Sequence, residues 1–161
     1  MTRINFQAIR NQAEIYGLSG RELLEERTDE ELAKVCNGIG AQWLDKIKIH
    51  GVSMSDYLNS LWPNWVVCAC IHDIRYGIGG TEKDRKKADK EMRDNCIAVV
   101  FAQYCVIDIR RWRGWLEARG IYKVLREFGE KAFNFVKDPS KENKKNPNDA
   151  AKGGEAQDHN D

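Results

Sequence analysis

The chain has 161 residues, and its 26 lysines and arginines almost balance its 25 aspartates and glutamates, giving a formal net charge of +1. This length is typical of one hydrophobic core, and the balanced charge lacks the basic excess that makes nucleic acid the expected partner. No run of about 18 apolar residues occurs, and the start MTRINFQAIRNQ lacks the apolar stretch of a secretory signal. We therefore expect a cytoplasmic protein that binds no nucleic acid.

The first third of the chain contains two capping-box patterns, each ahead of apolar residues at helical spacing. They are Ser19-x-x-Glu22 and Thr28-x-x-Glu31. The second pattern predicts a helix that runs into Cys36, after which Gly38 and Gly40 break the chain. Residues 41–63 have no clean periodicity, so their structure stays open.

A second set of patterns predicts the central helices. An apolar helix is expected to begin at Pro63 and to end in three closely spaced glycines, and the next helix to open at Thr81 with Asp84 as capping partner. The second helix continues one apolar stripe through Ala88, Met92, Cys96 and Val99. Beyond Cys105 we expect further helix, interrupted near Gly114 or Gly120. No convincing strand alternation appears, so the predicted fold class is all-α.

The last part of the sequence differs in composition. From Asp138 onward almost nothing can be buried, and prolines and paired glycines punctuate the segment. We predict a helical domain over residues 1–137 and a disordered polar tail over residues 138–161.

Five cysteines form an odd set, and three of them lie in apolar helical runs, so a full disulfide framework is not expected. The cluster Cys68-Ala-Cys70-Ile-His72 suggests zinc. Residues two apart on a helix point to different faces, however, so these groups are not expected to converge on a metal.

His72 and Asp73 form a polar pair inside the apolar helix, and Asp89 lies beside the apolar stripe of the next helix. Buried ionisable groups need partners, and His72 can pair with Asp89 if the two helices pack antiparallel. Tyr76, four residues after His72, shares its face, whereas Asp73 is rotated by about 100°. An imidazole held by a carboxylate, with one nitrogen free, is the arrangement of a general base.

Asp73 is expected to point towards the loop that contains Gly38 and Gly40. The glycines allow backbone carbonyls to turn towards a hard cation, and calcium prefers about six to eight oxygen ligands, including carboxylates and carbonyls. This combination favours calcium over zinc.

Three segments taken in order resemble one family. CNGIGA (Cys36–Ala41), CACIHDIRY (Cys68–Tyr76) and ADKEM (Ala88–Met92) are similar to the calcium loop, His-Asp-x-x-Tyr helix and second-helix aspartate of the phospholipase A2 superfamily. The similarity is greatest to the disulfide-poor bacterial and viral members, the phage type among them. The implied fold is an antiparallel helix pair with a glycine-rich calcium loop and extra N- and C-terminal helices.

The resemblance also implies the site and its reaction. Calcium would be bound by three backbone carbonyls and one carboxylate, those of Cys36, Gly38, Gly40 and Asp73. His72 would activate water, supported by hydrogen bonds with Asp89 and Tyr76, and the Gly38 amide would help to bind the oxyanion. The implied activity is hydrolysis of a phospholipid acyl ester, with a phospholipid or membrane surface as substrate. A phage-encoded member would act in the host cytoplasm or the virion.

The chain departs from secreted members of that family, which carry cysteines where it has Asn37, Ala69, Arg75 and Ala88. Only Cys68 and Cys96 correspond to a helix-linking bridge. A metal-dependent phosphohydrolase of the HD type is a further interpretation of the His-Asp dipeptide. That class needs additional separated ligands, which His50 and His159 do not supply convincingly.

Less specific interpretations remain open. Asp73 can be a solvated residue that pairs with Arg75 or Lys46, and Asp89 an ordinary surface aspartate. The alternative function is a non-catalytic phage or bacterial scaffold or binding protein that retains the helix pair, because fold does not establish function. The segment Arg110–Trp115 is either a membrane or partner-binding face, or a pair of core tryptophans with a solvated charged side.

Overall fold

The computed structural model describes residues 5–36, 48–49, 51–53, 56 and 60–136, so the predicted glycine loop and polar tail lie outside the described residues. The α-helices are α1 (Phe6–Ile15), α2 (Glu22–Glu25), α3 (Asp29–Val35), α5 (Val66–Ile78), α6 (Glu82–Gln103) and α7 (Ile109–Phe128). Short 3-10 helices cover η2 (Pro63–Trp65) and η3 (Gly129–Ala132), and β1 (Lys48–Ile49) pairs antiparallel with β2 (Val52–Ser53). The mostly helical architecture confirms the all-α prediction.

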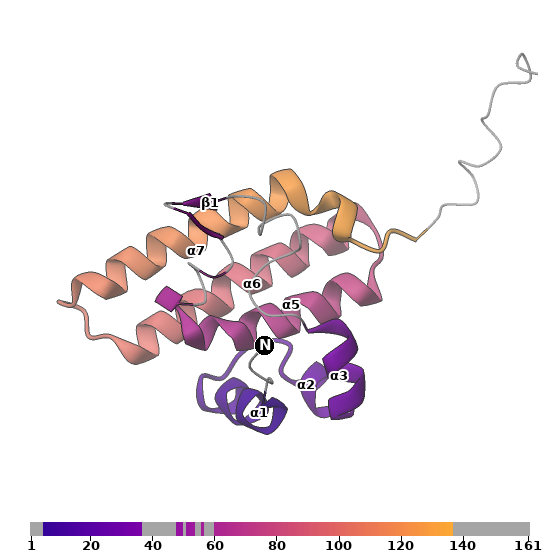
Figure 1. Ribbon diagram of the computed structural model, residues 1–161, viewed down its shortest axis with the longest axis horizontal. Helices are drawn as coiled ribbons and strands as arrows, with labels where there is room; N and C mark the ends of the chain where they lie inside the picture. Colours follow the sequence, from indigo (N-terminus) through magenta and orange to yellow (C-terminus); the bar gives the residue numbers. More distant parts are fainter. Residues whose placement is uncertain (1–4, 37–47, 50, 54–55, 57–59, 137–161) are drawn as a thin grey trace, which may run out of the picture.

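The three long helices α5, α6 and α7 run side by side, and α1 to α3 pack against α5 (Figure 1). Helix α5 lies at the centre, and most of its residues are buried, Cys68, Cys70 and Ile71 among them. Trp65, just before the start of α5, is buried as well. The apolar sequence of α5 therefore matches a helix covered on several sides. No helix among the described residues is long and apolar enough to cross a membrane.

Two of the three predicted capping boxes are present. The Thr28 hydroxyl accepts from the backbone N–H of Glu31, whose side chain accepts from Thr28 N–H at 2.9 Å. Thr81 and Asp84 make the same reciprocal pair at the start of α6. The box predicted at Ser19 is wrong, because α2 begins at Glu22 with Arg21 as its N-cap and no side-chain cap, and the Ser19 hydroxyl donates to Glu91 Oε1 on α6 at 2.8 Å.

The predicted interruption near Gly114 or Gly120 is also wrong, since α7 continues from Ile109 to Phe128. Gly114 is buried against α6, and a Cβ atom at this position would come within 2.6 Å of Val100 and 2.9 Å of Trp62. Gly120 is exposed, with nothing within 4 Å of such an atom. A helix-interior glycine costs only about 0.5–1 kcal/mol, which the packing of a long helix outweighs.

The turn between α5 and α6 is held by the segment that follows α7. Gly79 and Gly80 have φ values of 74° and 136°, which only glycine adopts readily. Gly80 N–H donates to the Asn134 carbonyl at 3.0 Å, and Val136 N–H donates back to the Gly80 carbonyl at 3.0 Å. The end of the described chain is thereby fixed beside the C-terminal turn of α5, next to Tyr76.

All five cysteines are free thiols, and every one except Cys105 is buried. Burial, with a hydrogen bond to the Cys68 sulfur, raises the pKa of the Cys96 thiol well above its ordinary value. Cys96 is therefore a protonated, apolar part of the core, and the absence of a full disulfide framework stays a prediction.

Candidate functional site

A buried cluster around Asp89 joins α5 to α6. Helix α5 presents His72 and Tyr76, one turn apart, towards α6, which carries Asp89. His72 Nε2 lies 3.1 Å from Asp89 Oδ1, and the Tyr76 hydroxyl donates to the same oxygen at 2.5 Å. The Asp89 side chain is fully buried, so the interpretation of Asp89 as a surface aspartate is wrong. The predicted contact of His72 with Asp89 is confirmed, whereas the hydroxyl of Tyr76 bonds Asp89 and not His72 as the resemblance implied.

Helix α7 contributes an arginine to the cluster that sequence reasoning missed. Arg126 Nη1 donates to Asp89 Oδ2 at 2.7 Å, and the other side of its guanidinium binds Glu82. Arg85 Nη1 lies 4.0 Å from the same Asp89 oxygen. Arg85 stands four residues before Asp89, so helical spacing provided a signal for it. No local pattern links Arg126 to an aspartate 37 positions earlier.

These donors determine the charge of Asp89. Burial raises the pKa of the Asp89 carboxyl, but hydrogen bonds from His72, Tyr76 and Arg126 outweigh burial, and the pKa lies below its ordinary value. Burial and the hydrogen bond to Asp89 raise the pKa of the Tyr76 hydroxyl. At neutral pH Asp89 is therefore an ionised acceptor and Tyr76 a protonated donor.

The tautomer of His72 follows from its partner. An ionised carboxylate only accepts hydrogen bonds, so in the neutral ring Nε2 carries the proton and Nδ1 the lone pair. Across the described residues, the hydrogen bonds of His72 involve Nε2 and not Nδ1. The His72 side chain is 8% exposed. This arrangement leaves Nδ1 as the nitrogen able to accept a proton.

Residues after α7 close the cluster around Tyr76. Phe133 packs edge-on against the Tyr76 ring with the ring centres 5.1 Å apart. At Gly129 a Cβ atom would lie 2.6 Å from the Tyr76 hydroxyl oxygen, so the glycine allows the backbone to approach this closely. The Tyr76 ring also contacts the His72 ring at 4.0 Å between centres. Tyr76 is thus held between His72 and the end of the described chain.

The predicted metal ligands are only partly within the described residues. Asp73 is half-buried on α5, and Cys36 is buried where α3 meets the same helix. The Cys36 thiol donates to the Cys70 carbonyl at 3.8 Å, so Cys36 lies against α5 about one turn before Asp73. Those two glycines lie outside the described residues. Over the described part of the chain, no three His, Cys, Asp or Glu side chains gather as metal ligands.

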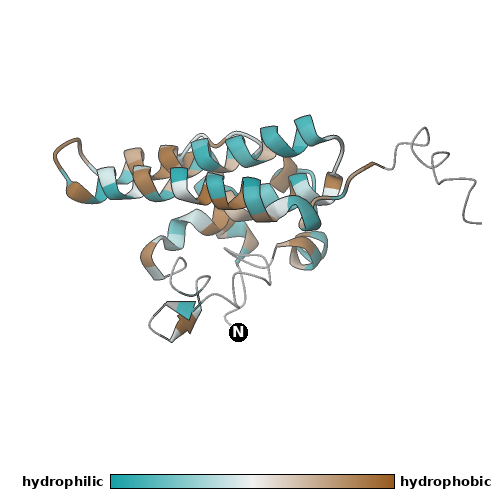
Figure 2. Cartoon of the chain, turned by 90° about the horizontal axis from the view of Figure 1, so that it is seen from above, coloured by the Kyte–Doolittle hydropathy of each residue, from teal (hydrophilic) through white to brown (hydrophobic). Residues whose placement is uncertain are grey.

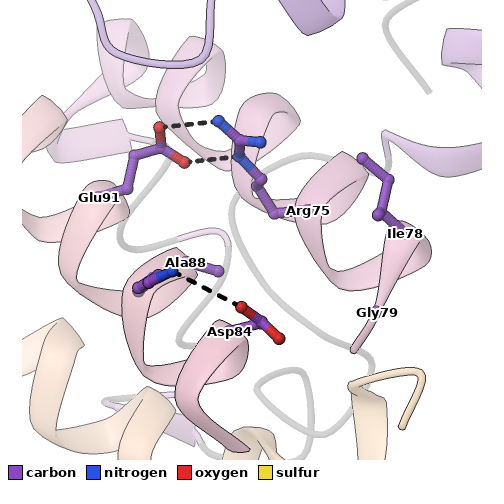
Figure 3. A pocket seen from close by; sticks show the side chains of 7 residues that line it. Arg75, Ile78, Gly79, Asp84, Ala88 and Glu91 are labelled. Carbon is purple, nitrogen blue, oxygen red and sulfur yellow. Dashed lines mark hydrogen bonds and ion pairs between the residues drawn. The ribbon is translucent and has the colours of Figure 1, made fainter. Parts of the chain in front are cut away.

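A separate cavity of about 380 Å³ opens between α5 and α6 beside the Gly79 turn (Figure 3). Arg75 and Glu91 face one another there and form an ion pair at 2.9 Å, and Arg75 also lies 3.6 Å from Glu22. The cavity is lined by neither His72 nor Asp89. Its charged side chains pair with one another, Arg75 with Glu91 and Lys87 with Asp84, so the cavity is distinct from the cluster around Asp89.

Comparisons of the chain with family models, curated proteins and solved structures found no match.

Proposed function

We propose that this chain is a calcium-dependent, phospholipase A2-like hydrolase that cleaves a phospholipid acyl ester with a water activated by His72. The observation that carries the proposal is the buried contact of His72 Nε2 with Asp89 Oδ1 at 3.1 Å, with Tyr76 on the same oxygen. It joins the two helices that resemble the catalytic helix pair of that superfamily. A histidine whose one nitrogen is held by an ionised carboxylate is prepared to accept a proton at the other.

The roles of the side chains follow from their bonds. His72 Nδ1 would take a proton from water as the water oxygen forms its bond to the ester carbonyl carbon. His72 would then return that proton to the departing alcohol oxygen. Asp89 would orient the ring and stabilise the imidazolium, while Tyr76 and Arg126 hold Asp89 in place. General-base catalysis of this kind contributes roughly 100-fold to 10,000-fold.

Calcium would be held by the Asp73 carboxylate with the carbonyls of Cys36, Gly38 and Gly40. The supporting observation is the position of Cys36, whose thiol bonds the Cys70 carbonyl one turn before Asp73 on the same helix. Carboxylate and carbonyl oxygens are the ligands that calcium prefers. When bound, the ion would polarise the ester carbonyl. The Gly38 amide is proposed as a donor to the oxyanion.

A non-catalytic scaffold or binding protein is the second candidate, and one contact favours it. Asp89 accepts from Arg126 on α7 as well as from His72 and Tyr76 on α5. A charged residue that joins three helices has a structural use even without catalysis, because buried ion pairs can specify a unique packing. Under this alternative the cluster would stabilise the fold, and no ester would be hydrolysed.

The decisive experiment measures fatty-acid release from mixed phospholipid vesicles, first with calcium and then with a chelator. We expect release only with calcium. His72→Gln should abolish hydrolysis and keep the calcium-induced rise in melting temperature, because the base does not contact the metal. Asp73→Asn should lose both hydrolysis and the calcium-induced rise in melting temperature. Asp89→Asn should keep calcium binding and lose less turnover than His72→Gln does.

The variants also separate the two candidates. A folded wild type that releases no fatty acid in calcium, or an active His72→Gln variant, would contradict the catalytic proposal. If calcium also left the melting temperature of the wild type unchanged, the metal site would be wrong as well. In that outcome the scaffold function would be the better account of the Asp89 cluster.

A further inference from the structure

The end of the α6–α7 hairpin carries exposed apolar side chains that the proposed reaction does not use. Two belong to the connecting loop and three to the first turns of α7, and we call them together the hairpin tip: Val106, Ile107, Ile109, Trp112 and Leu116. Ile107 is 89% exposed, Ile109 76% and Leu116 62%. The loop stands out as an apolar end of the elongated helical layer (Figure 2). The interpretation of Trp112 as a core tryptophan is wrong, because its side chain is exposed.

Helical geometry makes this surface continuous. Ile109, Trp112 and Leu116 are three and four residues apart, so they lie on one face of α7. The residues that bury α7 against α6, Gly114 and Ala118, lie on the opposite face. The apolar strip therefore points away from the core. Trp112 Nε1 donates to the Val106 carbonyl at 3.0 Å, which joins the strip to the loop.

Basic side chains flank the strip. Between Phe101 and Arg119 the chain has four arginines against the acids Asp108 and Glu117, an excess of positive charge. Arg110 and Arg119 are exposed, and each stacks on an aromatic ring, at 4.6 Å and 4.7 Å from the ring centre respectively. Arg113 is exposed and pairs with Glu117 at 2.8 Å. Apolar side chains bordered by arginines are complementary to the acyl chains and anionic headgroups of a lipid leaflet.

We propose that the hairpin tip is a membrane-docking surface that binds anionic phospholipid. Val106 and Ile107 would enter the boundary between headgroups and acyl chains, and Trp112 would lie at the interface, where tryptophan is favoured. Asp89 lies 14 residues before Gln103, the last residue of α6, and is therefore about 20 Å along the helix from the tip. Docking is thus separate from the proposed hydrolysis and does not depend on it.

The test uses the full chain in chelator, so that hydrolysis does not contribute, and measures cosedimentation with vesicles. Vesicles of phosphatidylcholine mixed with phosphatidylserine should bind the protein more tightly than phosphatidylcholine alone, and added salt should weaken that binding. Ile107→Glu should weaken binding by about tenfold or more, because it removes an apolar side chain that would enter the lipid on docking and adds a charge that anionic headgroups repel. Ile107 is exposed, so this change should leave the melting temperature unaltered.

Ile15→Glu is the matched control, because Ile15 is 77% exposed at the end of α1 and the substitution is the same. It should bind vesicles like the wild type. The proposal is overturned if the wild type does not bind phosphatidylserine vesicles, or if Ile15→Glu loses as much binding as Ile107→Glu. If Ile107→Glu binds phosphatidylserine vesicles as tightly as the wild type, charge alone attracts the protein, and the proposal that the hairpin tip docks is overturned. A dimer in sedimentation velocity that Ile107→Glu dissociates would assign the tip to a second copy of the chain.

Discussion

Replacing Arg126 with methionine tests whether α7 is fixed to the α5–α6 helix pair through Asp89. The substitution keeps an unbranched side chain of similar length but removes the guanidinium that donates to Asp89 Oδ2 at 2.7 Å. Asp89 is fully buried, so its charge would then depend on His72, on Tyr76 and on Arg85 at 4.0 Å. We expect the variant to be substantially less stable than the wild type.

The size of the expected loss of unfolding free energy follows from the burial of Asp89. Removing one partner of a buried ion pair costs about 3–5 kcal/mol, because the remaining charge stays out of water. Arg126 is itself 23% exposed, and two hydrogen bonds to Asp89 remain. We therefore expect Arg126→Met to lower the free energy of unfolding by an amount at the low end of this range, about 3 kcal/mol. Arg126→Lys should lose less, because it retains a positive charge near the carboxylate.

The assay is urea unfolding followed by circular dichroism, with Arg119→Met as the matched control on the same helix. Arg119 is exposed and stacks on Trp115, so its replacement should cost only about 0.5–1 kcal/mol. In an Asp89→Asn background the cost of Arg126→Met should fall, because the buried charge is gone. An Arg126→Met variant no less stable than Arg119→Met, or an undiminished cost in the Asp89→Asn background, would refute the reasoning.

Two further predictions concern α7 packing and the charge of Asp89. Gly114→Ala should destabilise the protein by about 1–3 kcal/mol through overpacking, and Gly120→Ala on the same helix should stabilise it by about 0.5–1 kcal/mol. Thermal unfolding of both variants checks this, and changes of the same sign would contradict the assigned contacts. The pKa of Asp89 is lowered in the fold. Its stabilising effect should therefore be complete above the unfolded value of about 3.9 and decline as the pH falls through the folded pKa. The difference in unfolding free energy between wild type and Asp89→Asn should thus stay constant from about pH 7 to about pH 5 and narrow as the pH falls below the unfolded value of about 3.9. A difference that does not narrow at low pH would contradict an ionised Asp89 in the folded protein.

Local rules of the sequence determined much of the helical layer and part of the candidate site. Thr28 and Thr81 begin helices because the hydroxyl and acidic partner of each cap are only three residues apart. The contact of His72 with Asp89, and the position of Tyr76 on the same face as His72, follow from helical spacing and a short glycine turn, which together place two helices antiparallel. These features depend on neighbours in the chain, so a single sequence was sufficient to predict them.

Tertiary structure decided the rest, because the deciding partners lie far apart in sequence. Ser19 has a valid capping pattern, yet Glu91, 72 residues later, accepts its hydroxyl. Arg126 reaches Asp89 only because α7 packs along α6, and Gly114 continues the helix because that packing is close. The same packing buries one face of α7 and leaves Trp112 exposed on the other. Hydrophobic pattern alone assigns apolar residues to a core, and only the packed helices determine which apolar face remains uncovered.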